Sequence, residues 1–319
     1  MLKYRFMPGP AHLRPKRPVT SNEPTEIQLP KTSFDVPVQR SLVHRRFTKG
    51  VLLTDGFQES EQSFIVSARW PRSHGFLRND DTIDSALVAE TLRQATIYVG
   101  HRFFGVPADS HFVMAGIRFE IDSESLAAGS NPIDLALHVT ARDIRRGSEG
   151  LTSMKTSVVF MQDAVEIATG EGDLKILSPK LYARTRKGYG GMRAGGVHPW
   201  PHQRAGGDVV LPLKEDQWEL IVDLTNPVYF DHPLDHVPGM LIIEAVRQVA
   251  RNLAGEARGD LTNFSAQFSH YLELQPKTIL VVRNFAEEDN GRIVLDAQVS
   301  QGPIAAITAT ATYKKSQIA

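Results

Sequence analysis

The chain has 319 residues, a length that predicts about two domains, each large enough for its own hydrophobic core. Lysine plus arginine equals aspartate plus glutamate at 36 each, and no long block of one charge stands out, so nucleic acid is not an expected partner. The absence of cysteine excludes disulfides, thiolate metal sites and a cysteine nucleophile. It is also compatible with a reducing compartment, and we expect a cytoplasmic protein.

Residues 1–40 are rich in proline and lack the apolar segment of a secretory signal. We expect them to form a flexible arm or one that wraps the protein surface. No run in the chain approaches the roughly 18 to 20 apolar residues that a membrane span requires, so no membrane partner is expected.

The next part of the chain predicts strands around a long helix. Two strands, 42–55 and 63–70, lead to a helix over about residues 84–101. Four strand-like segments follow, at 111–121, 133–144, 151–162 and 165–177. One helix followed by antiparallel strands is typical of an α+β unit.

Residues 178–207 are rich in glycine and in basic residues such as Arg184, Arg186 and Arg204. One interpretation is a mobile linker whose charges are solvated. The other is that some of these cations close over a ligand that carries a phosphate. The residues themselves leave both interpretations open.

After this segment the order of elements repeats. Two strands are predicted, at 208–213 and 218–224, then a helix at 239–254. Four more strands follow, at 263–274, 278–286, 292–301 and 304–314. The sequence therefore predicts two similar halves, 41–177 and 208–319.

The same motif, Glu-x-x-Arg-Gln, occurs in both predicted helices, at Glu90, Arg93 and Gln94 and again at Glu244, Arg247 and Gln248. The second helix has almost no polar face, so we expect protein to surround it on nearly every side. Burying an ionised carboxylate there costs several kcal/mol, roughly, unless it is paired. The arginine and glutamine lie three and four residues on, where they can supply that pairing.

Several segments together resemble one protein family. They are LVHR at 42–45, VLLTD at 51–55, LVAETLRQA at 87–95, GVP at 105–107 and FDHPLDHVPGMLIIEAVRQ at 230–248. These segments are similar to the paired repeats of the A-factor biosynthesis family. The resemblance implies a tandem (double) hotdog fold, in which an antiparallel sheet wraps one long central helix in each repeat.

The resemblance also implies an activity. Enzymes of this family transfer a β-ketoacyl group from acyl carrier protein, or from acyl-CoA, to a hydroxyl of dihydroxyacetone phosphate. Their products lead to the γ-butyrolactone, butenolide and furan autoregulators of actinomycetes. The resemblance implies no cofactor and leaves a homo-oligomer open. Relatives usually carry His-Asp-Pro before the first helix, whereas here Ile83, Asp84 and Ser85 stand there, which puts a site in the first repeat in doubt.

Glu244 has two interpretations. As a general base it would accept the proton of the attacking hydroxyl, with its pKa raised by burial. As a structural residue it would form an internal ion pair with Arg247. Arg247 and Arg93 would likewise either bind a substrate phosphate or pair with their glutamates, and we group Gln248 and Glu90 with them as candidate substrate-binding residues.

His232 and His236 precede Pro238-Gly239, as the catalytic histidine does in the similar β-hydroxyacyl carrier-protein dehydratases. In those enzymes the histidine stands farther from the proline, so its reach would differ here. Either histidine is a candidate to orient substrate or move a proton, or merely to satisfy loop carbonyls.

Gly239 begins the second helix, where unpaired backbone N–H groups can hold an oxyanion. The alternative is an ordinary helix start. The histidines are too scattered to predict a metal site, and no glycine-rich nucleotide loop follows a strand.

Two further functions stay open. The first is a hotdog dehydratase or thioesterase that uses Glu244 with His232 on acyl thioesters. The second is a non-catalytic acyl-binding regulatory protein, which the altered residues before the first helix would fit.

Overall fold

The computed structural model describes residues 33–71, 74, 84–122, 132–189, 207–255, 259–288 and 291–315. Most of the expected proline-rich arm and residues 190–206 of the expected linker lie outside these ranges. Within the described ranges, no helix combines the length and the apolar character needed to cross a membrane.

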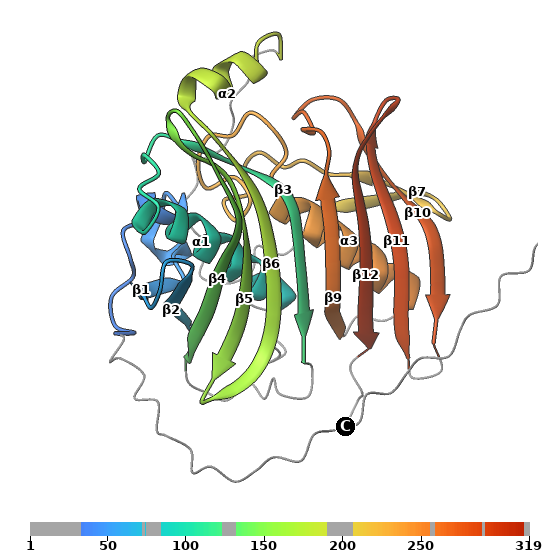
Figure 1. The fold of residues 1–319 in the computed structure, drawn as a ribbon. Helices are drawn as coiled ribbons and strands as arrows, with labels where there is room; N and C mark the ends of the chain where they lie inside the picture. The colour runs from blue at the N-terminus through green and yellow to red at the C-terminus, as the bar shows by residue number, and fades with distance from the viewer. Residues whose placement is uncertain are drawn as a thin grey trace, which may run out of the picture. The chain divides into compact units, whose positions relative to one another are not determined.

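Twelve strands form one antiparallel sheet (Figure 1). The first six are β1 (Leu53–Gln58), β2 (Ser63–Trp70), β3 (His111–Ile121), β4 (Ile133–Gly147), β5 (Gly150–Gln162) and β6 (Val165–Leu177). The second six are β7 (Val210–Lys214), β8 (Gln217–Leu220), β9 (Gly259–Phe268), β10 (Thr278–Glu287), β11 (Arg292–Gln301) and β12 (Ile304–Lys315). Across the sheet the order is β1-β2-β4-β5-β6-β3-β9-β12-β11-β10-β8-β7. The order of the first six strands is therefore mirrored by that of the second six.

The two halves of the sheet join where β3 pairs with β9. Gly116 lies opposite Gln267 and Glu120 opposite Asn263 in the antiparallel register. The rings of Phe119 and Phe264 stack across this junction with their centroids 5.5 Å apart. The sheet is therefore continuous from one half to the other.

Two long helices pack against the sheet and against each other: α1 (Ser85–Arg102) and α3 (Gly239–Ala254) (Figure 1). In α1 every residue up to His101 is buried except Arg93. In α3 every residue from Met240 to Ala250 is buried, which confirms the expectation that protein surrounds this helix. Burial on all sides explains why the sequence of α3 has almost no polar face, whereas most polar side chains of α1 are themselves buried.

The segment predicted as one strand at 42–55 is mostly not a strand. Two short 3-10 turns, Arg40–Val43 and Thr48–Gly50, come first, and pairing begins at Leu53. The side chain of Gln94 explains the difference, because it accepts the Leu52 N–H at 2.9 Å and donates to the Gly50 carbonyl at 2.7 Å. A side chain from α1 thus replaces a neighbouring strand.

Three other regions also differ from the sequence prediction. The strand expected at 218–224 ends at Leu220. The strand expected at 263–274 leaves the sheet after Phe268, and the following loop is fixed where Val237 donates its N–H to the Leu272 carbonyl. The segment expected to be a linker begins with a short helix, α2 (Pro179–Thr185). Arg186, just after it, is 9% exposed and ion-paired, so its charge is not a solvated one.

Candidate active site

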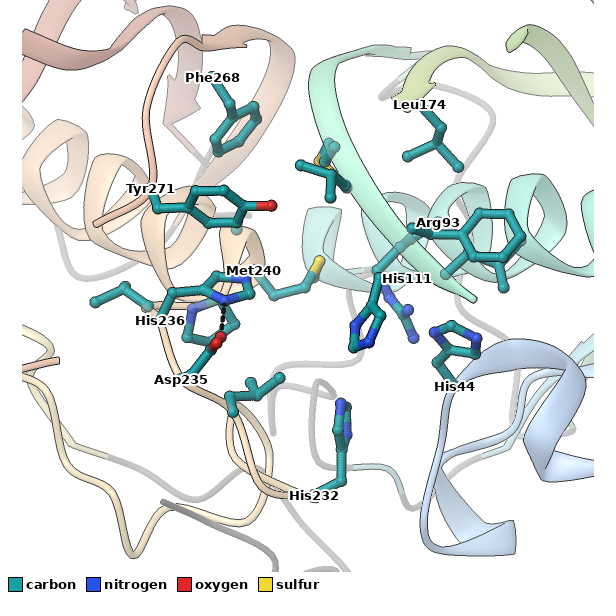
Figure 2. A pocket seen from close by; sticks show the side chains of 18 of the residues that line it. His44, Arg93, His111, Leu174, His232, Asp235, His236, Met240, Phe268 and Tyr271 are labelled. Atoms are coloured by element: carbon teal, nitrogen blue, oxygen red, sulfur yellow. Dashed lines mark hydrogen bonds and ion pairs between the residues drawn. The ribbon is translucent and has the colours of Figure 1, made fainter. Parts of the chain in front are cut away.

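A cavity of about 730 Å³ is lined by residues of both halves (Figure 2). Its apolar residues are Ile97, Phe112, Met114, Leu174, Met240, Phe268 and Ile307. Its polar side chains include His44, Arg93, His111, Tyr182, His232 and His236. Phe268 and Leu174 lie on the side of the cavity opposite His232. The cavity therefore offers both an apolar wall and a set of histidines and cations.

The first histidine of the cavity is paired with the residue before it. Nδ1 of His232 lies 2.5 Å from Oδ1 of Asp231, and the Asp231 side chain is buried. Burial alone would raise the pKa of Asp231, but the charge of Arg45 and the hydrogen bond to His232 hold it well below its usual range. An ionised Asp231 keeps the proton of neutral His232 on Nδ1, which leaves Nε2 as the proton acceptor. The His232 ring points into the cavity (Figure 2).

A second pair repeats this arrangement four residues later. Nδ1 of His236 lies 2.7 Å from Oδ1 of Asp235. The same oxygen accepts a 2.6 Å hydrogen bond from the Tyr182 hydroxyl, and Arg186 Nε donates to the other oxygen at 3.2 Å. Burial would raise the pKa of Asp235, whereas its bonds to His236 and Tyr182 and the charge of Arg186 lower it. This second pair is thus fixed by α2 and the turn that follows.

The tautomer of His44, a third histidine of the cavity, is set by a chain of hydrogen bonds that runs through His101. Nδ1 of His101 lies 2.8 Å from the Val106 carbonyl, so Nδ1 carries the proton and Nε2 accepts. Nε2 of His44, 2.9 Å from that nitrogen, must then be the donor. Burial lowers the pKa of His44 to about 3, so the ring is neutral at pH 7. Nδ1 of His44 is therefore an acceptor in the wall of the cavity.

The start of α3 lies at the cavity. Gly239 and Met240 both line it, and Pro238 at the N-cap position supplies no side-chain hydrogen bond to the first turn. The first N–H groups of a helix have no partner within it, and the helix dipole makes this end positive. This arrangement favours negative charge in the cavity.

The start of α1 is arranged differently. The Asp84 side chain accepts the Ala86 N–H at 2.9 Å. Asp260, from β9, accepts the Ser85 N–H at 2.9 Å and the Ser85 hydroxyl at 2.7 Å. Carboxylates of the protein thus accept hydrogen bonds from the first N–H groups of α1. The corresponding end of α3 lies at the cavity instead.

Glu90 lies behind the cavity wall and is fully buried. It accepts hydrogen bonds from Arg45 and Arg93, both at 2.9 Å, and from Gln94 at 2.6 Å. Burial raises its pKa, but the two arginines outweigh this and lower the pKa to about 2. Arg93 reaches the cavity from this cluster, and Arg45 extends to Asp231 with a 3.4 Å ion pair.

Glu244 makes the corresponding cluster in α3. Arg247 binds both its oxygens, at 2.9 and 2.8 Å, and Gln248 donates to it at 2.7 Å. All three side chains are buried, and none of them lines the cavity. Arg247 instead lies near Asp84 and Asp260. Burial lowers the pKa of Arg247, but the negative charges of Glu244, Asp84 and Asp260 raise it well above its usual value.

The family model of the A-factor biosynthesis hotdog domain matches residues 28–178 and 208–315. The chain belongs to this family. It is 35% identical over 267 residues to the 2-oxo-3-(phosphooxy)propyl 3-oxoalkanoate synthase of Streptomyces virginiae, covering 80% of this chain and 90% of that one. It is 32% identical over 269 residues to the synthase of the same name from Streptomyces griseus, covering 79% and 88%.

A solved structure shows the same fold. An acyl-ACP thioesterase from Bacteroides thetaiotaomicron VPI-5482 aligns with a TM-score of 0.50 over 78% of this chain and 98% of that one. At 10% sequence identity this likeness concerns the fold alone. The A-factor family protein therefore has a hotdog fold, built on a large antiparallel sheet.

Within this A-factor family protein, the cavity includes four of the residues singled out from the sequence, namely Arg93, His232, His236 and Gly239. Glu90, Glu244, Arg247 and Gln248 are not among its lining residues. Glu244 therefore does not line this cavity, and its role as the base stays a prediction. The reason is geometric, because each helix places its Glu-x-x-Arg-Gln motif near the start of the other helix, and only the start of α3 lies at the cavity.

Sequence reasoning missed the two aspartates that orient the histidines. Their signal is the Asp-His pair repeated with a spacing of four, Asp231-His232 and Asp235-His236. It also missed Arg45, Tyr182 and His44, which come from distant segments. Among the described residues, no group of three or more histidines and carboxylates is arranged to hold a metal ion.

Proposed function

We propose that this A-factor family protein transfers a β-ketoacyl group from an acyl carrier protein to a hydroxyl of dihydroxyacetone phosphate, in the cytoplasm. The product would be a 2-oxo-3-(phosphooxy)propyl 3-oxoalkanoate, the compound in the names of its relatives. The observation that carries the proposal is the Asp231–His232 pair, which shares one cavity with Arg93 and the start of α3.

The finer architecture belongs to the same proposal. We infer two hotdog repeats, 41–177 and 208–319, each with its own central helix and joined by 178–207. The mirrored strand order and the two separate matches of the family domain support this division. In such a tandem this cavity lies between the repeats, and both contribute lining residues to it.

His232 is the proposed general base. Its Nε2 accepts the proton of the attacking hydroxyl, and Asp231 stabilises the imidazolium that forms. The new alkoxide attacks the thioester carbonyl and gives a tetrahedral oxyanion. When that intermediate collapses, the carbon–sulfur bond breaks, and the proton on His232 passes to the departing thiolate.

The start of α3 is the proposed site for the oxyanion. The first N–H groups of the helix and its dipole favour the charge that develops on the thioester oxygen. A side chain at position 239 would come no closer than 3.5 Å to Phe268 and 3.6 Å to Met114, so glycine is not required there by packing. Its place at the first turn of the helix supports the proposed role instead.

Arg93 is the proposed ligand of the phosphate. Its Nε and Nη2 atoms hold Glu90, and it is the one residue of α1 up to His101 that is not buried. Arg46 also lines the cavity and adds positive charge to that side. The apolar residues of the cavity, Met114, Leu174 and Phe268 among them, suit the acyl chain.

The test is a reaction of purified protein with a β-ketoacyl carrier protein and dihydroxyacetone phosphate. We expect mass spectrometry to detect the phosphorylated ester, with far less product when dihydroxyacetone replaces its phosphate. Release of free acid at a rate independent of the acceptor would instead support a thioesterase. Acyl binding without turnover would support a non-catalytic protein.

A further inference from the structure

The segment that follows β6 has two different sides. Tyr182 and Arg186, four residues apart, face the protein and are buried. The Tyr182 ring stacks on His111 with centroids 3.7 Å apart, and Arg186 donates to both oxygens of Glu273 at 2.7 Å. These contacts, together with those to Asp235, fix α2 and the turn after it in one position.

The other side of the segment is cationic. Lys180, Arg184 and Lys187 are exposed; the first two lie four residues apart on one face of α2, and Lys187 follows in the turn after the helix. None of them forms an ion pair with a residue in the described part of the chain. Residues 178–189 contain no aspartate or glutamate. Three positive charges thus lie within eight residues of the chain and have no ion-pair partner among the described residues.

Two large apolar side chains lie among these cations. Leu181 is 43% exposed and Tyr189 is 56% exposed. Solvent-exposed apolar groups with a charged rim are the usual composition of a protein–protein interface. We call Lys180, Leu181, Arg184, Lys187 and Tyr189 the α2 surface.

The α2 surface adjoins the cavity. Tyr182 and Thr185 of the same helix line the cavity, and α2 stands beyond the end of β6 (Figure 1). A partner bound to the α2 surface would therefore sit beside the part of the cavity wall that Tyr182 and Thr185 form.

We propose that the α2 surface is the docking site of the acyl carrier protein that donates the β-ketoacyl group. This inference rests on the proposed function and adds the place and chemistry of partner recognition. Carrier proteins are small and acidic and present the acyl thioester on a long prosthetic arm. Their charge complements the three cations, their apolar helix surface suits Leu181 and Tyr189, and the arm has only to pass Tyr182 and Thr185.

The test compares two acyl donors in a charge-reversed variant, Lys180→Glu with Arg184→Glu. With β-ketoacyl carrier protein we expect kcat/KM to fall at least about tenfold, mainly through KM, and to lose most of its dependence on salt. With a β-ketoacyl N-acetylcysteamine thioester, which has no protein to dock, kcat/KM should stay within twofold of wild type, roughly, because neither residue lines the cavity.

The matched control carries the same charge change elsewhere. Lys214→Glu with Arg283→Glu alters exposed residues of β7 and β10, which lie outside the cavity lining. We expect this variant to use both donors like wild type. Equal losses in the two variants with carrier protein would overturn the proposal, because net charge alone would then explain the effect.

Direct binding separates docking from catalysis. Calorimetry with holo carrier protein should show weaker binding to Lys180→Glu with Arg184→Glu and to Leu181→Ser, and unchanged binding to the control. Unchanged affinity in the first two variants would overturn the proposal even if their turnover is lost. Failure of wild type to acylate dihydroxyacetone phosphate from the small thioester would count against the proposed function, whereas the binding result would still decide on the docking site.

Discussion

At the residue scale, the proposed catalytic pair depends on a residue far away in sequence. Asp231 and His232 are neighbours in the chain, and neighbouring side chains in a regular strand point to opposite faces. Here they lie in an irregular loop, where Arg46 donates its backbone N–H to Asp231 at 3.1 Å and the Arg45 side chain lies 3.4 Å away. The orientation of His232 is therefore a property of both halves of the protein.

Replacing the proposed base gives the most direct test at this scale. We expect His232→Ala to lower kcat by a factor of about 10² to 10⁴, the usual contribution of general base catalysis. The fall in kcat should appear in steady-state assays while the circular dichroism spectrum stays unchanged. His270→Ala is the control, because His270 also lines the cavity but has no aspartate partner among the described residues. Similar kcat values for both variants would exclude His232 as the base.

Arg93 and Arg247 provide a matched pair for the phosphate site, because each holds the glutamate three residues before it and only Arg93 lines the cavity. We expect Arg93→Lys to raise the KM for dihydroxyacetone phosphate about tenfold, since lysine cannot bind phosphate and Glu90 through one planar group. The KM for the acyl donor should not change. Arg247→Lys should leave both KM values unchanged, and a rise in the acceptor KM there would contradict the assignment.

At the element scale, the starts of the two long helices decide where chemistry can occur. Both helices were predicted from apolar patterning, and their observed bounds lie within one residue of the prediction. What the pattern did not contain is the environment of each start. Asp260 fills the start of α1 from a strand of the other half, whereas α3 begins at the cavity. The first helix start is therefore closed to a substrate anion in this structure.

Glu244→Gln distinguishes the structural role of this residue from a catalytic one. The substitution leaves Arg247 buried without its carboxylate, so we expect the free energy of unfolding to fall by about 3 kcal/mol. Turnover per folded molecule should remain within about twofold of wild type, because other residues line the cavity. Urea denaturation and kinetics on the same preparation check both values. A folded variant with a hundredfold lower kcat would restore Glu244 as the base.

Stability should depend on pH through a histidine of the segment before β1. The pKa of His44 is lowered by burial from 6.5 to about 3, so the folded protein disfavours its protonation. As the pH falls, His44 takes up a proton in the unfolded state before it does so in the folded state. Its contribution to the free energy of unfolding is therefore fully present above pH 6.5 and is lost as the pH falls toward 3. We expect His44→Gln to flatten the dependence of the urea midpoint on pH between 7.5 and 5. An unchanged slope would contradict a buried neutral His44.

At the scale of the whole molecule, a shared sheet and a shared cavity join the two halves. The pairing of β3 with β9 makes the backbone hydrogen bonding of the sheet continuous between the two halves. Arg45 adds a second link, because it forms ion pairs with Glu90 in α1 and with Asp231 in the second half. Because each half depends on these contacts, we do not expect either half to stay folded when the other unfolds. We therefore expect the two halves to unfold together.

Two tryptophans allow this expectation to be measured, because Trp70 is buried in the first half and Trp218 in the second. With Trp200 replaced by phenylalanine throughout, tryptophan fluorescence and far-UV circular dichroism should report the same urea midpoint within each variant that retains only Trp70 or only Trp218. Phe264→Ala removes the ring stacked on Phe119 and should destabilise the protein by about 3 to 5 kcal/mol, moving both midpoints equally. Separate midpoints would show that the halves unfold independently.

The sequence by itself determined the secondary structure of most of the chain, because the spacing of apolar residues reflects local geometry that every strand and helix must obey. It also placed His232, His236, Gly239 and Arg93 among the candidates. Only the tertiary structure decided which Glu-x-x-Arg-Gln motif lies nearer the cavity, and why 42–52 does not pair as a strand. Those outcomes depend on contacts such as Arg45 with Asp231 and Ser85 with Asp260, which join residues more than a hundred positions apart. No local pattern records such contacts, since they exist only once the two halves have packed together.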